Sequence, residues 1–227
     1  MTVFAIVASR GAPPSFRSRH GGRLRVVREH ALAAVVNDRA GVSSPTTATL
    51  RRYDRLMHEL AERFPAILPV RFGTQMAEDE LRSILSSRRT SLGGALAHVR
   101  KRAQMTVRVV RRNADGEREG PVPPASRLPP EGGSDRRLTG RDYLRSRARA
   151  AAARRAVQGF EPVRRAVARW VRDERVEHRA GVSSVYHLIP RSSADAYRYA
   201  AQTSAASSGV TAIVSGPWPP YAFAAFE

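Results

Sequence analysis

The stretch that decides the fold is residues 56–76, LMHELAERFPAILPVRFGTQM. Its first half completes an apolar stripe at helical spacing, which predicts an amphipathic helix. The stripe consists of Leu50, Tyr53, Leu56, Met57, Leu60 and Phe64. Pro65 ends the helix because proline lacks an amide hydrogen and clashes with the preceding turn. The apolar run Ala66–Phe72 then predicts a buried strand that contains Arg71, and Gly73 predicts a tight turn after it.

The segments on either side of this stretch repeat the mixture of strands and helices. Further strands are expected at residues 3–7, 24–29, 31–36 and 105–109, and further helices at 77–85 and 91–101. Thr46 or Thr47 can cap the main helix, and residues 9–22 are expected to form a loop. A sheet covered by helices would bury these apolar faces, so the first part of the chain is predicted to be α+β.

A neutral segment rich in proline and glycine, residues 112–138, divides the chain. After it we expect a long helical segment from Thr139 to about His178, kinked or divided at Gly159 and Pro162. A strand at 182–189, a helix at 193–207 and a strand at 210–214 follow. The sequence therefore predicts two α+β domains. Their bounds are 1–111 for the N-terminal domain, 112–138 for a Pro/Gly-rich linker or loop, and 139–227 for the C-terminal domain.

The C-terminal domain ends in an unusual tail, GPWPPYAF at residues 216–223. Its prolines can neither continue a sheet ladder nor form a helix, so a stiff, extended tail with aromatic anchors is expected. Such a tail loses little entropy on docking. Trp218 and Tyr221 are expected to pin it, and packing on the protein itself is favoured over contact with a partner.

The composition limits the function. Lys and Arg total 39 against 20 Asp and Glu, for a net charge of +19, and Lys101 is the only lysine. The absence of cysteine excludes disulfides and thiolate chemistry and fits a reducing compartment. No apolar run approaches the ~18 residues of a membrane span, and the start lacks the basic region of a secretory signal. We therefore expect a cytoplasmic protein without a membrane partner.

No catalytic constellation is evident. The sequence contains no GxSxG elbow, P-loop or GxGxxG motif, and no histidine pair has HExxH spacing. Each histidine is expected at the surface or at the edge of the core. The six are His20, His30, His58, His98, His178 and His187. The expectation is a protein with no enzymatic activity, no cofactor and no metal site.

The positive charge makes a nucleic-acid-binding regulator the alternative function. One candidate cluster consists of Arg17, Arg19, Arg23, Arg25 and Arg28. Binding of single strands also needs exposed aromatic rings for stacking, but aromatic residues are only 7% of the chain and most lie on predicted buried stripes. Nucleic acid is therefore the weaker of the two interpretations.

Several ordered segments resemble the gas vesicle protein family GvpL/GvpF. They are HELAERF at 58–64, AILPVRFGTQM at 66–76, DELRSIL at 79–85, GRDYLRSRA at 140–148, SVYHLIPR at 184–191 and IVSGPWPPYAF at 213–223. The resemblance spans nearly the whole chain, and LPVRFGT and SGPWPPY are its most specific parts. One departure is the strand that contains Gln104, Met105 and Thr106, where the resemblance implies a glutamate.

The resemblance implies two α+β domains with ferredoxin-like sheet-and-helix elements. It implies a non-enzymatic assembly protein of gas vesicles, the gas-filled shells that provide buoyancy. The implied partners are the hydrophobic shell subunit and other gas vesicle accessory proteins, bound through an apolar surface or an exposed sheet edge. Arg71 would either tie the domains together or contact a partner, and the structural role is favoured. The implied structural or partner-binding residues are Leu68, Pro69, Val70, Arg71, Phe72, Gly73, Gly216, Pro217, Trp218, Pro219, Pro220 and Tyr221.

Overall fold

A computed structural model describes residues 1–38, 44–110, 157–179 and 182–224. The chain forms two compact units. Unit 1 comprises Met1–Met105, Leu188–Asp195 and Ser215–Glu227, and unit 2 comprises Thr106–His187 and Ala196–Val214. The expected linker at 112–138 and both of its boundaries lie outside the described residues. Residues 188–195 and 215–227, which the sequence-based division places in the C-terminal domain, group with unit 1.

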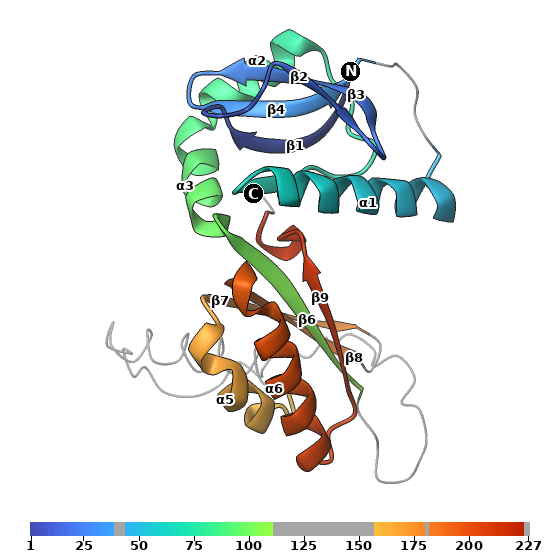
Figure 1. Ribbon diagram of the computed structural model, residues 1–227, viewed down its shortest axis with the longest axis vertical. Coiled ribbons are helices and arrows are strands. Elements are labelled where there is room, and N and C mark those ends of the chain that lie inside the picture. Colours follow the sequence, from blue (N-terminus) through green and yellow to red (C-terminus); the bar gives the residue numbers. More distant parts are fainter. Residues whose placement is uncertain (39–43, 111–156, 180–181, 225–227) are drawn as a thin grey trace, which may run out of the picture. The chain divides into compact units, whose positions relative to one another are not determined.

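Unit 1 contains a five-stranded antiparallel sheet in the order β2-β3-β4-β1-β5 (Figure 1). The strands are β1 (Thr2–Ala8), β2 (Ser15–Ser18), β3 (Gly22–Glu29), β4 (Leu32–Asn37) and β5 (Ile67–Pro69). β2 lies within the segment expected to be a loop, because its four residues are too few to show a clear alternation. β5 is shorter than predicted because the chain turns at residues 71–74, where the Thr74 amide donates to the Arg71 carbonyl at 3.2 Å.

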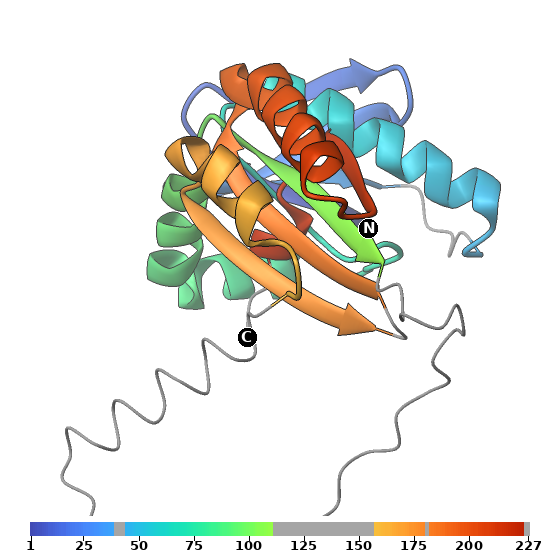
Figure 2. The same cartoon turned by 90° about the horizontal axis from the view of Figure 1, so that it is seen from below.

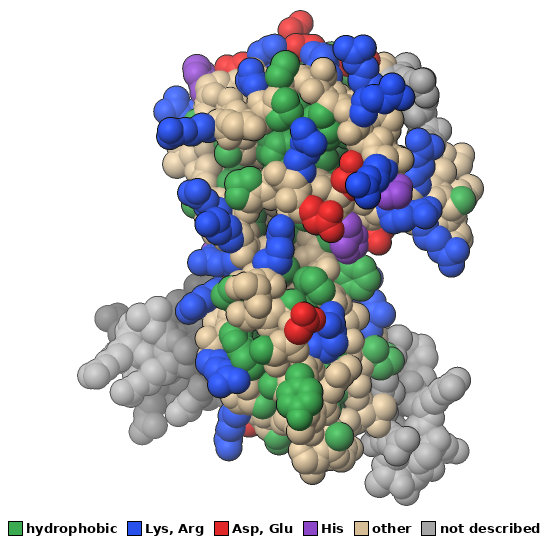
Figure 3. All heavy atoms as spheres, viewed as in Figure 1, with side chains coloured by type: hydrophobic (Ala, Val, Ile, Leu, Met, Phe, Trp, Pro, Cys, Tyr) green, Lys and Arg blue, Asp and Glu red, His purple; other side chains and the backbone are tan. Residues whose placement is uncertain are grey.

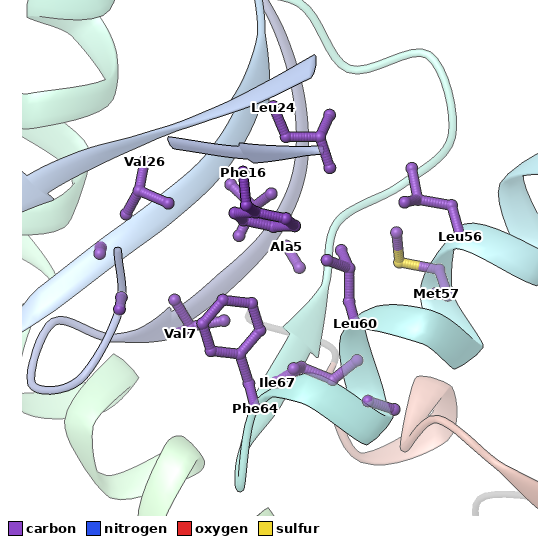
Figure 4. Packing of buried hydrophobic residues seen from close by; sticks show 14 residues of the cluster. Ala5, Val7, Phe16, Leu24, Val26, Leu56, Met57, Leu60, Phe64 and Ile67 are labelled. Atoms are coloured by element: carbon purple, nitrogen blue, oxygen red, sulfur yellow. The ribbon is translucent and has the colours of Figure 1, made fainter. Parts of the chain in front are cut away.

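Three helices cover this sheet. They are α1 (Thr47–Arg63), α2 (Glu78–Ser87) and α3 (Arg89–Val99). Thr46 caps α1 as predicted, in a capping box with Thr49. Apart from Leu50, which is exposed, the predicted stripe of α1 packs on alternate strand residues, including Val7, Leu24 and Val26 (Figure 4). The strand residues that alternate with these are buried on the other face of the sheet. On that face α2 contacts β3, and α3 contacts β1 and β4.

The second sheet has the strand order β7-β8-β6-β9. Its strands are β6 (Arg102–Val110), β7 (Asp173–Arg179), β8 (Val182–Pro190) and β9 (Ala212–Trp218). Helices α5 (Glu161–Val167) and α6 (Ala194–Ser207) lie side by side on one face of it (Figures 1 and 2). Short 3-10 turns lie after α5 at Ala168–Trp170, before α6 at Arg191–Ser193, and after β9 at Tyr221–Phe223.

Two sequence-based expectations about this part are wrong. The helix expected to reach His178 ends near Trp170, and the charged segment Asp173–Arg179 is strand β7. Charges on alternating exposed positions suit an edge strand, which helical periodicity cannot reveal. β9 also runs through Pro217, although prolines were expected to stop the ladder. β9 lies at the edge of the sheet, where one side of the strand has no neighbouring strand. Proline lacks an amide hydrogen, and at an edge its absence does not break the ladder.

The predicted α+β class with two sheets is confirmed. Residues 139–156 of the expected helical segment lie outside the described residues, whereas Gly159 and Pro162 do mark the start of a separate helix, α5. Among the described residues, no helix is long and apolar enough to cross a membrane.

Candidate functional site

The segment LPVRFGT forms the end of β5 and the turn after it. Leu68 and Pro69 are buried, and the Val70 amide donates to the Phe4 carbonyl at 2.9 Å. Gly73 has φ of +81°, a left-handed conformation that glycine adopts without steric cost. Arg71 is exposed, and no described residue bonds to its side chain. The favoured role of Arg71 as a structural tie therefore has no support in the described part of the chain.

The C-terminal tail packs within unit 1. Pro219 and Pro220 are buried, and the chain then closes a 3-10 turn at Tyr221–Phe223 where an extended tail was expected. The Ala222 amide donates to the Gln104 side-chain oxygen at 2.8 Å. Gln104 occupies the strand where the resemblance implied a glutamate, and it is buried. A polar residue at this buried position therefore fixes the tail.

The two predicted tail anchors contact helix α1. The Tyr221 hydroxyl donates to the Asp54 carboxylate at 3.3 Å, and burial with the nearby Asp54 charge raises the pKa of Tyr221. The Trp218 ring meets His58 edge to face at 5.3 Å between centroids. Tyr53 donates its hydroxyl proton to the Val70 carbonyl, and burial raises its pKa to about 12. Both tyrosines thus remain protonated donors at neutral pH.

These contacts bring the two motifs together around one apolar cavity of about 450 Å³. Pro69, Val70, Arg71 and Phe72 come from the first motif and Tyr221 from the second. The remaining lining residues are Val3, Ile6, Tyr53, Met76, Leu81, Ile84 and Ala224. Arg71 is the single charged residue of this lining, so the cavity offers apolar surface beside one exposed guanidinium.

The sequence did not reveal that two residues of α2, Leu81 and Ile84, line this cavity. Their apolar spacing indicates only that one helix face is buried, and it does not show that Ile84 borders a hollow. The other residues of the two motifs do not contribute to the cavity. Gly216 and Pro217 lie in β9, and Leu68, Gly73, Trp218, Pro219 and Pro220 do not line the cavity.

Unit 2 holds a buried polar cluster that the sequence did not reveal. His187 is 0% exposed, so its expected place at the surface or core edge is wrong. Its Nε2 lies 2.8 Å from the Glu174 carboxylate, and its Nδ1 lies 2.6 Å from the Tyr197 hydroxyl. Arg164 donates two hydrogen bonds to Glu174, at 3.0 and 3.2 Å. Both ring nitrogens of His187 therefore have hydrogen-bond partners.

Burial opposes ionisation of Glu174, but the hydrogen bonds from His187 and Arg164 outweigh it and lower its pKa from 4.5 to about 2. Burial and the Glu174 charge raise the pKa of Tyr197. Among the described residues, no group of three or more His, Cys, Asp or Glu side chains could hold a metal ion. The hydrogen bonds that join Arg164, Glu174, His187 and Tyr197 give the cluster the character of a fixed network.

Acid is expected to weaken unit 2 through Glu174. Because its pKa is lower in the folded state, the ionised form stabilises the fold above pH 4.5, and this contribution is lost as the pH falls towards about 2. Urea unfolding at a series of pH values, followed by fluorescence of Trp170, would measure it in a Trp218→Phe background. Glu174→Gln should be less stable at neutral pH but lose less on acidification. Glu177→Gln, an exposed control, should keep the acid dependence of the parent protein; an equal loss in Glu174→Gln would contradict the prediction.

Comparison with known proteins agrees with the motifs. The profile described as gas vesicle synthesis protein GvpL/GvpF matches residues 2–225. The chain belongs to the GvpL/GvpF family. This membership confirms the resemblance and supports a role in gas vesicle assembly. A search of curated protein sequences finds no match.

Two solved structures share the fold of this GvpL/GvpF protein. The gas vesicle protein GvpF from Anabaena sp. PCC7120 matches with a TM-score of 0.68 and 10% identity, over 100% of this chain and 98% of that one. GvpF from Microcystis aeruginosa matches with a TM-score of 0.69 and 10% identity, over 99% of this chain and 98% of that one. At such low identity the likeness concerns the fold alone.

Proposed function

We propose that this GvpL/GvpF protein binds the hydrophobic shell subunit and helps to nucleate or build the gas vesicle. The observation that carries the proposal is the apolar cavity formed where the two family motifs meet, with Arg71 exposed at its lining. A very hydrophobic subunit must be kept from aggregating before it joins the shell. The proposed role is non-enzymatic and places the protein in the cytoplasm, at the growing vesicle.

The cavity suits this partner in size and chemistry. A volume of about 450 Å³ would hold one or two apolar side chains of the subunit. Burying each would contribute roughly 1.5–3 kcal/mol. The guanidinium of Arg71 would orient the bound segment by donating hydrogen bonds to a carboxylate or carbonyl oxygen. The other members of the assembly machinery remain further candidate partners.

The alternative of nucleic-acid binding has weaker support. Several arginines are engaged by carboxylates in the structure. Arg25 pairs with Asp38 and Glu78, each at 2.8 Å, and Arg82 pairs with Glu78 at 2.8 Å. Charge neutralised in this way contributes little to phosphate binding.

Reversal of the charge of Arg71 is expected to reduce binding of the shell subunit. Arg71→Glu should lower the affinity by about tenfold, because a favourable contact becomes a repulsive one. The measurement is co-purification of the tagged protein with the shell subunit, in cells that lack the other vesicle proteins. Arg89→Glu, another exposed arginine of unit 1, is the control with the same change of charge.

The wild type and Arg89→Glu should recover the subunit, and Arg71→Glu should not. Absence of the subunit from all three preparations would refute the proposed function. Equal recovery by all three would place the binding surface elsewhere. In the native host, deletion of the gene should abolish the light scattering that collapses under pressure, which intact vesicles produce.

A further inference from the structure

The β2–β3 hairpin places two arginines directly opposite each other. Arg17 pairs with Arg23 in the antiparallel register, and both are exposed. Like charges at such positions destabilise a hairpin. Neither side chain has an ion pair within the described part of the chain. Arg25, further along β3, contrasts with them because two carboxylates neutralise it.

Other residues fix the position of this hairpin. The Ser18 hydroxyl donates to Glu59 of α1 at 2.8 Å, and the Arg19 amide donates to both oxygens of that carboxylate at 3.1 Å. Arg52 of α1 donates to the His20 carbonyl at 2.6 Å. The hairpin is therefore anchored without the Arg17 and Arg23 side chains, which makes a purely structural role for this pair of charges difficult to explain.

Both arginines line one hollow of about 1130 Å³ in unit 1. Arg52 and His20 line it too, and Asp38, the acidic residue of its lining, is paired with Arg25. Figure 3 shows Lys and Arg side chains spread over the face of unit 1 that it presents. Besides Arg25, the hollow thus presents three arginines, and its lining has no acidic group left to neutralise the opposed pair.

We propose that Arg17 and Arg23 bind a carboxylate in an acidic segment of a partner protein, with Arg52 as a third cation. One carboxylate has two oxygens with which it can accept hydrogen bonds from both guanidinium groups. Binding would also remove the repulsion between the two arginines. This site is distinct from the apolar cavity, although Tyr53 and Phe72 line both, and it does not depend on the function proposed above.

A protein partner fits this hollow better than nucleic acid. Its aromatic rings pack on one another, with centroid distances of 6.4 Å for Phe4–Tyr53 and 5.4 Å for Tyr53–Phe72, so they are not free to stack on bases.

The test compares three forms of the full chain by isothermal titration with a hexaglutamate peptide. The wild type should bind, and Arg17→Gln/Arg23→Gln should lose affinity by about tenfold or more. Arg88→Gln/Arg89→Gln removes the same charge elsewhere in unit 1 and should lose less than about threefold. Urea unfolding provides a second readout, because removal of the repulsion should raise the midpoint of Arg17→Gln/Arg23→Gln.

Several outcomes would overturn the proposal. These are no binding of hexaglutamate by the wild type, or equal losses in the two double variants. Tighter binding of an oligothymidylate of equal charge, lost in the same variant, would assign the site to nucleic acid. A lower urea midpoint for Arg17→Gln/Arg23→Gln would show that the pair stabilises the hairpin, as a purely structural role requires.

Discussion

We expect His187→Ala to lower the free energy of unfolding of unit 2 by about 3–5 kcal/mol. The substitution removes the hydrogen bonds of 2.8 Å to Glu174 and 2.6 Å to Tyr197. Glu174 would keep its negative charge in a mostly buried position with Arg164 as its remaining partner. The Tyr197 hydroxyl would lose its partner, and the vacated ring would leave a cavity beside Phe160.

Urea unfolding followed by Trp170 fluorescence would measure this loss, because Trp170 lies 6.4 Å from the Tyr197 ring. Two tyrosine variants form a matched pair. Tyr197→Phe removes one buried hydroxyl and should cost about 1–3 kcal/mol. Tyr186→Phe removes an exposed bond to Glu177 and should cost under about 1 kcal/mol. Equal effects of the two tyrosine changes would show that the cluster does not stabilise unit 2.

Gly216→Ala is expected to destabilise unit 1 by about 3 kcal/mol or more. Gly216 has φ of +117°, a conformation that residues with a Cβ rarely adopt. An added Cβ would lie 2.7 Å from the Gln104 carbonyl oxygen and 3.0 Å from the Met105 sulfur. The backbone oxygen cannot move away without separating β9 from β6. No side chain therefore fits at position 216 of this chain without a shift of the backbone.

Glycines in helix α3 give the opposite expectation. At Gly93 and Gly94, an added Cβ would meet no atom within 4 Å, and both lie inside Arg89–Val99. Gly93→Ala should therefore stabilise the protein by about 0.5–1 kcal/mol. Urea midpoints of the two variants, with Trp218 fluorescence reporting the tail, provide the comparison. A Gly216→Ala protein as stable as the wild type would refute the close contact.

The sequence predicted those parts of the fold in which a local pattern matches a buried face. The stripe from Leu56 to Phe64 gave α1, and the cap at Thr46 gave its start. The sequence-based prediction was wrong where the place of a segment in the sheet, and not its local pattern, decides its structure. Asp173–Arg179 has the charge density of an exposed helix, but as β7 it lies at a sheet edge. Likewise, Pro217 is tolerated because β9 is an edge strand.

The sequence alone also determined the family, because LPVRFGT and the proline-rich tail are local and specific strings. Tertiary structure decided what those strings build. Only packing brings Tyr221 to the cavity beside Val70 and Arg71, sets Arg17 opposite Arg23, and buries His187 between Glu174 and Tyr197. Helical and strand periodicities act over a few residues, whereas each of these groupings joins different elements, so no single segment contains the information that specifies it.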